Sequence, residues 1–182
     1  MTYKQKLIQF NSTSKYLVEM DFMIKLLSPK KNEKILDYGC GTGFMVEELN
    51  SNTEAEVFGY DIENYLLIQD KHRFRNSYHF KFDKVYFMHS IAHIENLIIS
   101  LNYLKYNLLV DNGEIHIITP NKLWLDNIAK KDYIPDPTVV THFTCEELMD
   151  ILRNCGYKII HYGQFGEILK GQHERIFIKA FV

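Results

Sequence analysis

Apolar side chains follow two different spacings along the chain, and the change of spacing separates predicted helices from predicted strands. Residues 3–10 and 14–27 carry apolar side chains three and four positions apart, which predicts two helices near the amino terminus. Short apolar runs that favour buried strands come next, at 34–38, 55–62, 83–90 and 114–120. Helical patterns follow the first three of these runs, at 44–50, 63–74 and 94–109, the last ending near a turn signal at 111–113.

The pattern changes after Pro120. Residues 121–143 predict a short helix and then a loop, and a well-marked helix starts at Thr144, with Glu147 completing a capping box and Gly156 at its end. Two strand-like runs, 158–163 and 175–182, are close enough to form an antiparallel hairpin. We therefore expect a doubly wound α/β fold. Its sheet is mostly parallel, with helices on both faces and an antiparallel strand at the carboxyl terminus.

Length and composition narrow the class of protein. A chain of 182 residues predicts a single domain, with 1–28 as a helical cap and 29–182 as a core that includes a short cap segment at 121–143. The net charge of −2 gives no basic field for nucleic acid or an anionic membrane. Three scattered cysteines favour a reducing compartment, and the chain shows neither a signal peptide nor an apolar run of membrane-spanning length. We expect a cytoplasmic protein.

The stretch DYGCGTG, residues 37–43, places glycines at alternate positions between a strand and a helix. Such a turn lets the backbone approach a ligand at the carboxyl end of the first strand. The dinucleotide fingerprint requires a third glycine at position 44, which is Phe44 here. Asp37 precedes the glycines and Asp61 ends the second strand, where a carboxylate can accept both hydroxyls of a ribose.

These residues resemble the class I S-adenosylmethionine-dependent methyltransferases, in their small-molecule branch. ILDYGCGTGF is similar to the first motif of that family, VFGYDI to its acidic second strand, and FDKVYFMHSIAHIEN to its fourth-strand segment. The resemblance implies S-adenosyl-L-methionine as cofactor. Asp37 would orient the loop or receive the cofactor's ammonium, Asp61 would bind the ribose, and Ile62 would flank the adenine. The implied cofactor-binding residues are Asp37, Gly39, Cys40, Gly41, Gly43, Asp61, Ile62, Met88 and His89.

Two departures from the family pattern bear on this site. Only 22 positions separate Asp61 from Asp83, so the third strand of the family is shortened or missing here. The Glu that is common before the family histidine is Ala92, so no metal role transfers with it. His89 and His93 are four positions apart, but no third ligand accompanies them, and we expect no metal.

Candidate chemistry rests on a few histidines and aromatic residues. His93 aligns with a family histidine after the fourth strand, and His142 lies in a segment that faces the acceptor in relatives; both are candidate bases. Tyr16, Trp124 and Tyr133 are candidates for an apolar substrate pocket, which a homodimer partner could complete.

The sequence therefore predicts an enzyme that moves a methyl group by in-line displacement to an O, N or C atom of a small-molecule acceptor. The alternative is a non-catalytic, cofactor-binding homologue that acts as a regulatory or partner subunit, which the compressed 61–83 region favours. A nicotinamide oxidoreductase is a further alternative, against which Phe44 argues.

Overall fold

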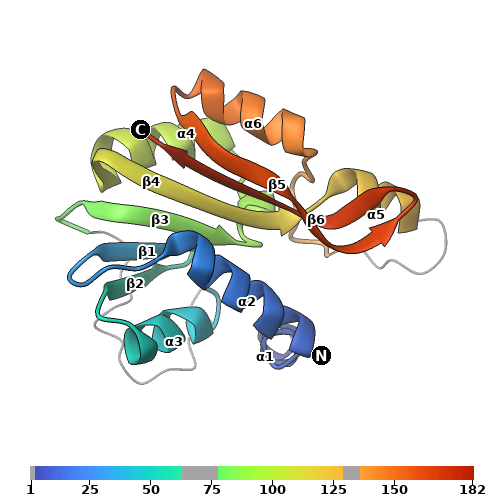
Figure 1. Ribbon diagram of the computed structural model, residues 1–182, viewed down its shortest axis with the longest axis horizontal. Helices are drawn as coiled ribbons and strands as arrows, with labels where there is room; N and C mark the ends of the chain where they lie inside the picture. The colour runs from blue at the N-terminus through green and yellow to red at the C-terminus, as the bar shows by residue number, and fades with distance from the viewer. Residues whose placement is uncertain (1–2, 63–77, 129–135) are drawn as a thin grey trace.

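The computed structural model describes residues 3–62, 78–128 and 136–182, and these build one six-stranded sheet (Figure 1). The strand order is β2-β1-β3-β4-β6-β5. Neighbours from β2 to β4 pair in parallel, whereas β6 pairs antiparallel with both β4 and β5. The strands are β1 Lys34–Tyr38, β2 Glu56–Tyr60, β3 Phe82–Met88, β4 Leu109–Pro120, β5 Lys158–Leu169 and β6 Gln172–Phe181. This sheet confirms the predicted α/β architecture.

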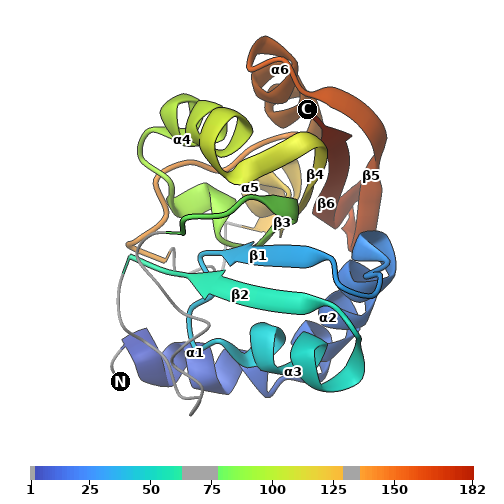
Figure 2. The same ribbon diagram turned by 90° about the vertical axis from the view of Figure 1, so that its left-hand side faces the viewer.

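Helices cover both faces of the sheet. Figure 2 shows α2 and α3 on one side of β1 and β2, with α4 on the opposite side. α4 continues into a π-helical turn, η3, and a short 3-10 helix, η2, follows β3. The bounds are α1 Tyr3–Asn11, α2 Ser14–Leu27, α3 Phe44–Asn52, η2 Ile91–His93, α4 Leu97–Tyr103, η3 Leu104–Leu108, α5 Lys122–Ile128 and α6 Cys145–Asn154.

Each face of the sheet has its own hydrophobic core. On one face, Leu101 and Leu104 pack with Leu148 and Leu152 of α6 and with side chains from β3, β4 and β6. On the other face, side chains of α2 and α3 pack against β1, β2 and the end of β3. Burial of apolar surface on both faces fixes which side of each strand faces which helix layer.

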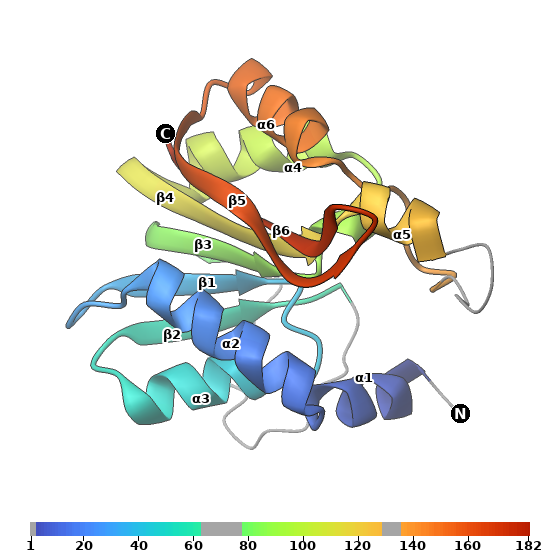
Figure 3. The same ribbon diagram turned by 45° about the vertical axis from the view of Figure 1, so that its right-hand side comes forward.

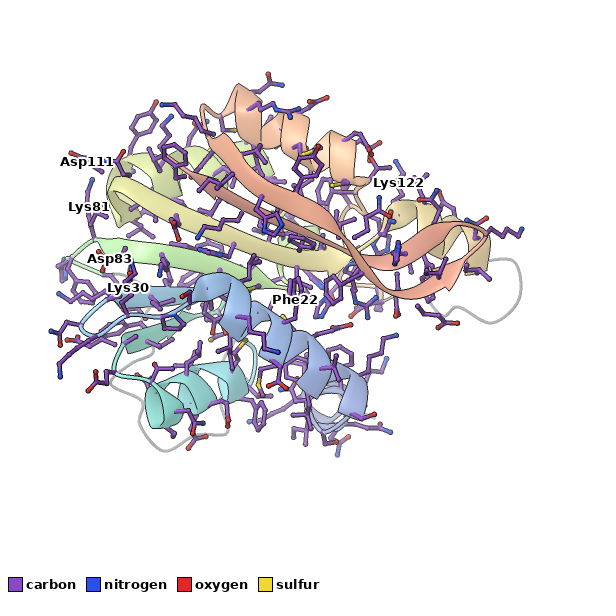
Figure 4. The ribbon with its side chains drawn as sticks, viewed as in Figure 1. Phe22, Lys30, Lys81, Asp83, Asp111 and Lys122 are labelled. Carbon is purple, nitrogen blue, oxygen red and sulfur yellow. The ribbon has the colours of Figure 1, made fainter. Side chains whose placement is uncertain are left out.

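The two edges of the parallel strands are easy to tell apart in Figure 4. Lys30, Lys81 and Asp83 mark the edge where β1 and β3 begin, and Lys122, two residues after the end of β4, marks the carboxyl edge. Figure 3 shows α1 and α2 passing along the sheet and reaching beyond that carboxyl edge. The N-terminal helices therefore extend over the carboxyl edge of the parallel strands.

Two details of the fold differ from the pattern of the sequence. The predicted turn at 111–113 lies inside β4, where the pairing with β3 shifts register between Phe82 and Lys84 and Asn112 has φ +61°. The turn signal instead produces a bulge, because residues 110–113 of β4 lie opposite the single β3 residue Asp83. The residues Tyr78–Lys81, part of the weak candidate for a third strand, form no strand, and the predicted helix at 63–74 lies outside the described residues.

Candidate functional site

The strand order reverses between β1 and β3. The chain runs from β1 to β2 on one side and then returns to β3 on the other. In doubly wound sheets, ligands bind at the carboxyl ends of the strands where the order reverses in this way. Gly39 directly follows β1, and Ser90 lies two residues after the end of β3. A Cβ on Gly39 would lie 2.3 Å from Ser90 Cβ, so the two segments are in contact and position 39 has no room for a side chain.

The glycine turn adopts a backbone that favours glycine. Gly39, Gly41 and Gly43 have φ of +88°, +54° and +79°, in the left-handed region. The N–H groups of Gly39 and Cys40 donate to the Tyr60 carbonyl at 2.7 and 3.0 Å, which ties the turn to the end of β2. Gly43 is the N-cap of α3, so the turn leads directly into a helix amino terminus.

Two carboxylates border the turn and have different environments. Asp37 is buried, its Oδ2 accepts a hydrogen bond from the Tyr86 hydroxyl at 2.8 Å, and burial raises its pKa to about 8. Its Oδ1 is buried without a hydrogen-bond partner among the described residues. Asp61 Oδ2 accepts from the Gly41 N–H at 2.7 Å, so this carboxylate already holds the turn.

The N-terminal helices close over the glycine turn. Asn11 at the end of α1 donates from Nδ2 to Thr42 Oγ1 at 2.7 Å, and a Cβ on Gly41 would lie 3.6 Å from Leu7 Cδ1. Tyr16, a predicted pocket residue, is buried against Phe44, and burial together with the charge of Asp37 raises its pKa. The sequence predicted the helix α1, but no feature of the sequence indicated that Leu7 and Asn11 lie at the glycine turn.

The two candidate bases lie near each other on two segments, His93 in η2 and His142 in the stretch before α6. Val140 and Thr141 N–H groups both donate to the Ala92 carbonyl, which holds the segment before His142 against η2. His93 Nδ1 lies 2.9 Å from Thr138 Oγ1. Partial burial and the nearby His93 lower the pKa of His142.

The remaining predicted residues have varied surroundings. Trp124 is buried below the ammonium of Lys15, 5.8 Å from its ring centroid, and Tyr133 lies outside the described residues. Met88 and Cys40 pack in the core of the α2 and α3 face, and burial raises the pKa of the Cys40 thiol. Ile62 is 88% exposed, so its side chain is free for a ligand to cover.

A cluster of charged side chains at the carboxyl end of β3 was not predicted. His89 Nε2 lies 2.5 Å from Glu19 Oε2, and Arg175 Nε lies 2.7 Å from Glu19 Oε1. Arg175 also pairs with Glu174, which in turn pairs with Lys15. The members come from α2, the end of β3 and β6, so their proximity follows from packing and has no signal in the local sequence.

Two general findings concern the described residues as a whole. Over 3–62, 78–128 and 136–182, no three His, Cys, Asp or Glu side chains gather in a way that could hold a metal ion. Within the same ranges, every helix is too short or too polar to cross a membrane.

Comparison with known proteins places this geometry in context. Residues 15–162 match the sequence pattern of a family described as "Methyltransferase domain". A SAM dependent methyltransferase from Archaeoglobus fulgidus has the same fold, with a TM-score of 0.73 and 18% identity over 100% of both chains. A SAM dependent methyltransferase from Aquifex aeolicus has a TM-score of 0.71 and 14% identity over 100% of this chain and 99% of that one.

A third similar structure contains a ligand. Magnesium protoporphyrin IX methyltransferase from Synechocystis PCC 6803, solved with bound SAH, has a TM-score of 0.68 and 16% identity. The match covers 100% of this chain and 88% of that one. None of the curated proteins compared with the chain matches it. Structures with such low sequence identity show that the fold is shared. The reaction has to be argued from the residues of the site.

Proposed function

Because the chain belongs to the methyltransferase-domain family, we propose that it moves the methyl group of S-adenosylmethionine to an O, N or C atom of a small-molecule acceptor. The family match confirms the resemblance on which the sequence prediction rests. The observation that carries the proposal is the turn at 39–43, with three glycines at positive φ between the carboxyl groups of Asp37 and Asp61.

The groups around the turn suit an aminoacyl nucleoside. The unpartnered Asp37 Oδ1 is an acceptor for an ammonium group, and Asp61 is an acceptor for ribose hydroxyls. Gly39, Cys40, Gly41 and Gly43 would form the wall beside the methionine portion. Ile62 would cover the adenine, and the backbone at Met88 and His89 would line the opposite wall.

When bound, the cofactor supplies a methyl group that its sulfonium already activates. The chain's residues therefore have to hold the acceptor in line and exclude water, and alignment alone can contribute roughly 7–11 kcal/mol. Tyr16 and Trp124 would provide apolar walls for the acceptor, with Tyr133 as a third candidate. His93 and His142 are candidates to take up a proton at the acceptor atom, a role worth about 10²–10⁴-fold in rate.

Isothermal titration with S-adenosylmethionine and with S-adenosylhomocysteine tests the cofactor assignment. We expect both to bind, and we expect Asp61→Ala to weaken binding by about 1.5–3 kcal/mol, because a charge-assisted hydrogen bond is lost. Asp111→Ala is the matched control, since Asp111 is exposed and lies near Lys81, at the edge where β3 begins, in Figure 4. Failure of both ligands to bind at high micromolar concentration would overturn the proposal.

An assay for transfer of a labelled methyl group distinguishes an enzyme from a non-catalytic, cofactor-binding homologue. We expect label to appear in at least one member of a panel of small hydroxyl, amine and carbon acceptors. Tight binding of the cofactor without transfer, together with stable co-purification with another protein, would instead indicate a non-catalytic partner subunit.

A further inference from the structure

The strand β5 forms a long free edge of the sheet. It has 12 residues, and among the residues that the structure describes it pairs only with β6, so its outer side presents unpaired backbone N–H and C=O groups (Figure 2). The opposite edge, β2, has five residues, and the Tyr78 hydroxyl donates to its Gly59 carbonyl at 2.6 Å. A short edge strand is one of the ways in which proteins limit pairing with other chains, and β5 lacks this protection.

The side chains of β5 also leave its edge open to another strand. None of its residues is buried, although five consecutive residues of the neighbouring β6 are. Ile160, Tyr162 and Ile168 are each between 50% and 60% exposed. The strand contains no proline, and its only Lys, Arg, Asp or Glu side chains are Lys158 and Glu167, close to its two ends. Proline and charged side chains usually protect an edge strand, so the middle of β5 is suited to pairing.

Two bulges limit the regular part of this edge to residues 161–165. The pairing of β5 with β6 shifts register just before and just after this segment, whereas the five residues between the shifts follow one register. Gly163 lies at the centre of the segment. Residues that lie opposite each other in an antiparallel pair must face the same side of the sheet. A two-fold axis at Gly163 meets this condition, because it pairs residues that are an even number of positions apart.

We propose that β5 of a second copy of this chain pairs antiparallel with β5 about a two-fold axis at Gly163, so that two six-stranded sheets become one. The axis pairs His161 of each copy with Phe165 of the other, and Tyr162 with Gln164. Each copy covers the free edge of the other, so the assembly closes as a dimer and does not extend into a filament. The inference is independent of the proposed methyl transfer.

The two charges of β5 favour a second copy as the occupant of this edge. Lys158 precedes the regular segment and Glu167 follows it. The two-fold axis brings Lys158 of each copy opposite Ile168 of the other, one position from Glu167, so two pairs of opposite charge form across the interface. A parallel arrangement would instead place like charges side by side. The strand therefore complements itself when it is antiparallel, which is what a two-fold interface requires.

A polar hollow beside the regular segment provides a place for the exposed tyrosine of the second copy. The hollow has a volume of about 410 Å³ and lies between β5, the start of β6 and the start of α6. Glu146, Gln164, Gln172 and His173 are among the residues that line it. The two-fold axis places Tyr162 of one copy opposite Gln164 of the other. Its ring is therefore brought beside the hollow, where amide and carboxylate oxygens can accept a hydrogen bond from its hydroxyl.

Sedimentation velocity of the full chain tests the dimer. We expect a dimer at micromolar concentration, and we expect Tyr162→Lys to weaken it at least about tenfold, because each copy would place an ammonium group in the interface. Tyr106→Lys is the matched control and should leave the dimer unchanged, since Tyr106 is 68% exposed in η3 and lies outside the sheet. A protein that is monomeric at high micromolar concentration would overturn the proposal, as would a dimer that Tyr162→Lys leaves intact.

Reversal of the two charges of β5 tests the antiparallel register. Lys158→Glu and Glu167→Lys should each weaken the dimer by about 2- to 30-fold, because two exposed ion pairs become pairs of like charge. The variant with both substitutions should regain the dimer, since opposite charges again lie together. A double variant that is as weak as either single variant would contradict the proposed pairing.

Hydrogen exchange provides a readout that needs no substitution. The amides of residues 161–165 that point away from β6 should exchange more slowly at high protein concentration than at low concentration, because pairing with the second copy protects them. Exchange rates that are the same at both concentrations would overturn the proposal. Protection that requires the addition of a different protein would also overturn it, because the edge would then belong to another partner.

Discussion

The side chain of Asp37 lies at the carboxyl end of β1 with 3% of its surface exposed, and its partner is the equally buried Tyr86 hydroxyl. Burial raises its pKa to about 8, and the nearby Asp61 charge adds to this effect while the Tyr86 hydrogen bond opposes it. The free protein therefore holds this carboxyl group mostly uncharged at neutral pH. A cation bound at Oδ1 would favour the charged form.

The raised pKa of Asp37 should make the stability of the free protein depend on pH. Between the ordinary pKa of about 3.9 and the folded value of about 8, the folded state binds more protons than the unfolded state. Stability should therefore fall as pH rises through that window, by at most about 1.4 kcal/mol per pH unit from this group. Urea unfolding from pH 5 to 8 should show a shallower decline for Asp37→Asn, and parallel curves would contradict the assignment.

Alanine substitutions at two glycines with similar backbone conformations distinguish the cost of positive φ from the cost of a steric clash. Gly39 and Gly171 have φ of +88° and +78°, but a Cβ on Gly39 meets Ser90 whereas one on Gly171 meets nothing within 4 Å. We expect Gly171→Ala to cost about 1–2 kcal/mol from φ alone, and Gly39→Ala to cost at least about 1 kcal/mol more. Chemical unfolding of both variants measures the difference, and equal losses would show that the Ser90 contact relaxes freely.

At the scale of elements, α6 is stabilised by its capping box. Thr144 Oγ1 accepts from the Glu147 N–H at 3.1 Å, and Glu147 Oε2 accepts from the Thr144 N–H at 2.9 Å. Thr144→Ala should lower the free energy of unfolding by about 0.5–2 kcal/mol. Thr141→Ala, at an exposed threonine just outside the helix, is the control and should change it by less than about 0.5 kcal/mol.

The limits of local prediction are clear in β4. The residue types at 111–113 are typical of a turn, so the local sequence predicts that no strand continues through them. The structure continues the strand through them, with Asn112 at φ +61° and the Gly113 carbonyl accepting from the Val182 N–H at 3.1 Å. Pairing partners far along the chain decide the outcome, and local composition contains no information about them.

At the scale of the whole molecule, Lys84 joins the N-terminal helices to the sheet. Its Nζ donates to the Leu27 carbonyl at 2.9 Å and pairs with Glu33 Oε2 at 2.7 Å, while the side chain is 7% exposed. Lys84→Met should cost about 3–5 kcal/mol, because it removes the cation that pairs with Glu33 and with the carbonyl at the end of α2.

The control for this prediction is an ion pair on the surface. Lys31 and Glu54 are 3.2 Å apart, with side chains 67% and 70% exposed. Lys31→Met should change unfolding by no more than about 0.5 kcal/mol, since exposed pairs contribute little. Similar losses in the two variants would show that Lys84 does not act as a buried link.

Much of the architecture was predictable, because the hydrophobic period records which face of each element is buried. The structure confirms the helices predicted at 3–10 and 14–27, the strand predicted at 34–38 and the capping box at Thr144, with the first helix one residue longer than predicted. The order of strands across the sheet was not predicted and comes from the structure. The predicted roles of His93, His142 and the cofactor-binding residues remain predictions that ligand binding and kinetics must test.

By itself, the sequence determined the glycine turn, because Gly39, Gly41 and Gly43 between Asp37 and a helix leave few alternatives for the backbone. The tertiary structure alone decided what surrounds it. Leu7 and Asn11 reach the turn from α1, and Glu19 meets His89 and Arg175 from elements far apart in the chain. The physical reason is that backbone conformation depends on neighbouring residues, whereas charge pairing and burial depend on how packed elements meet in space.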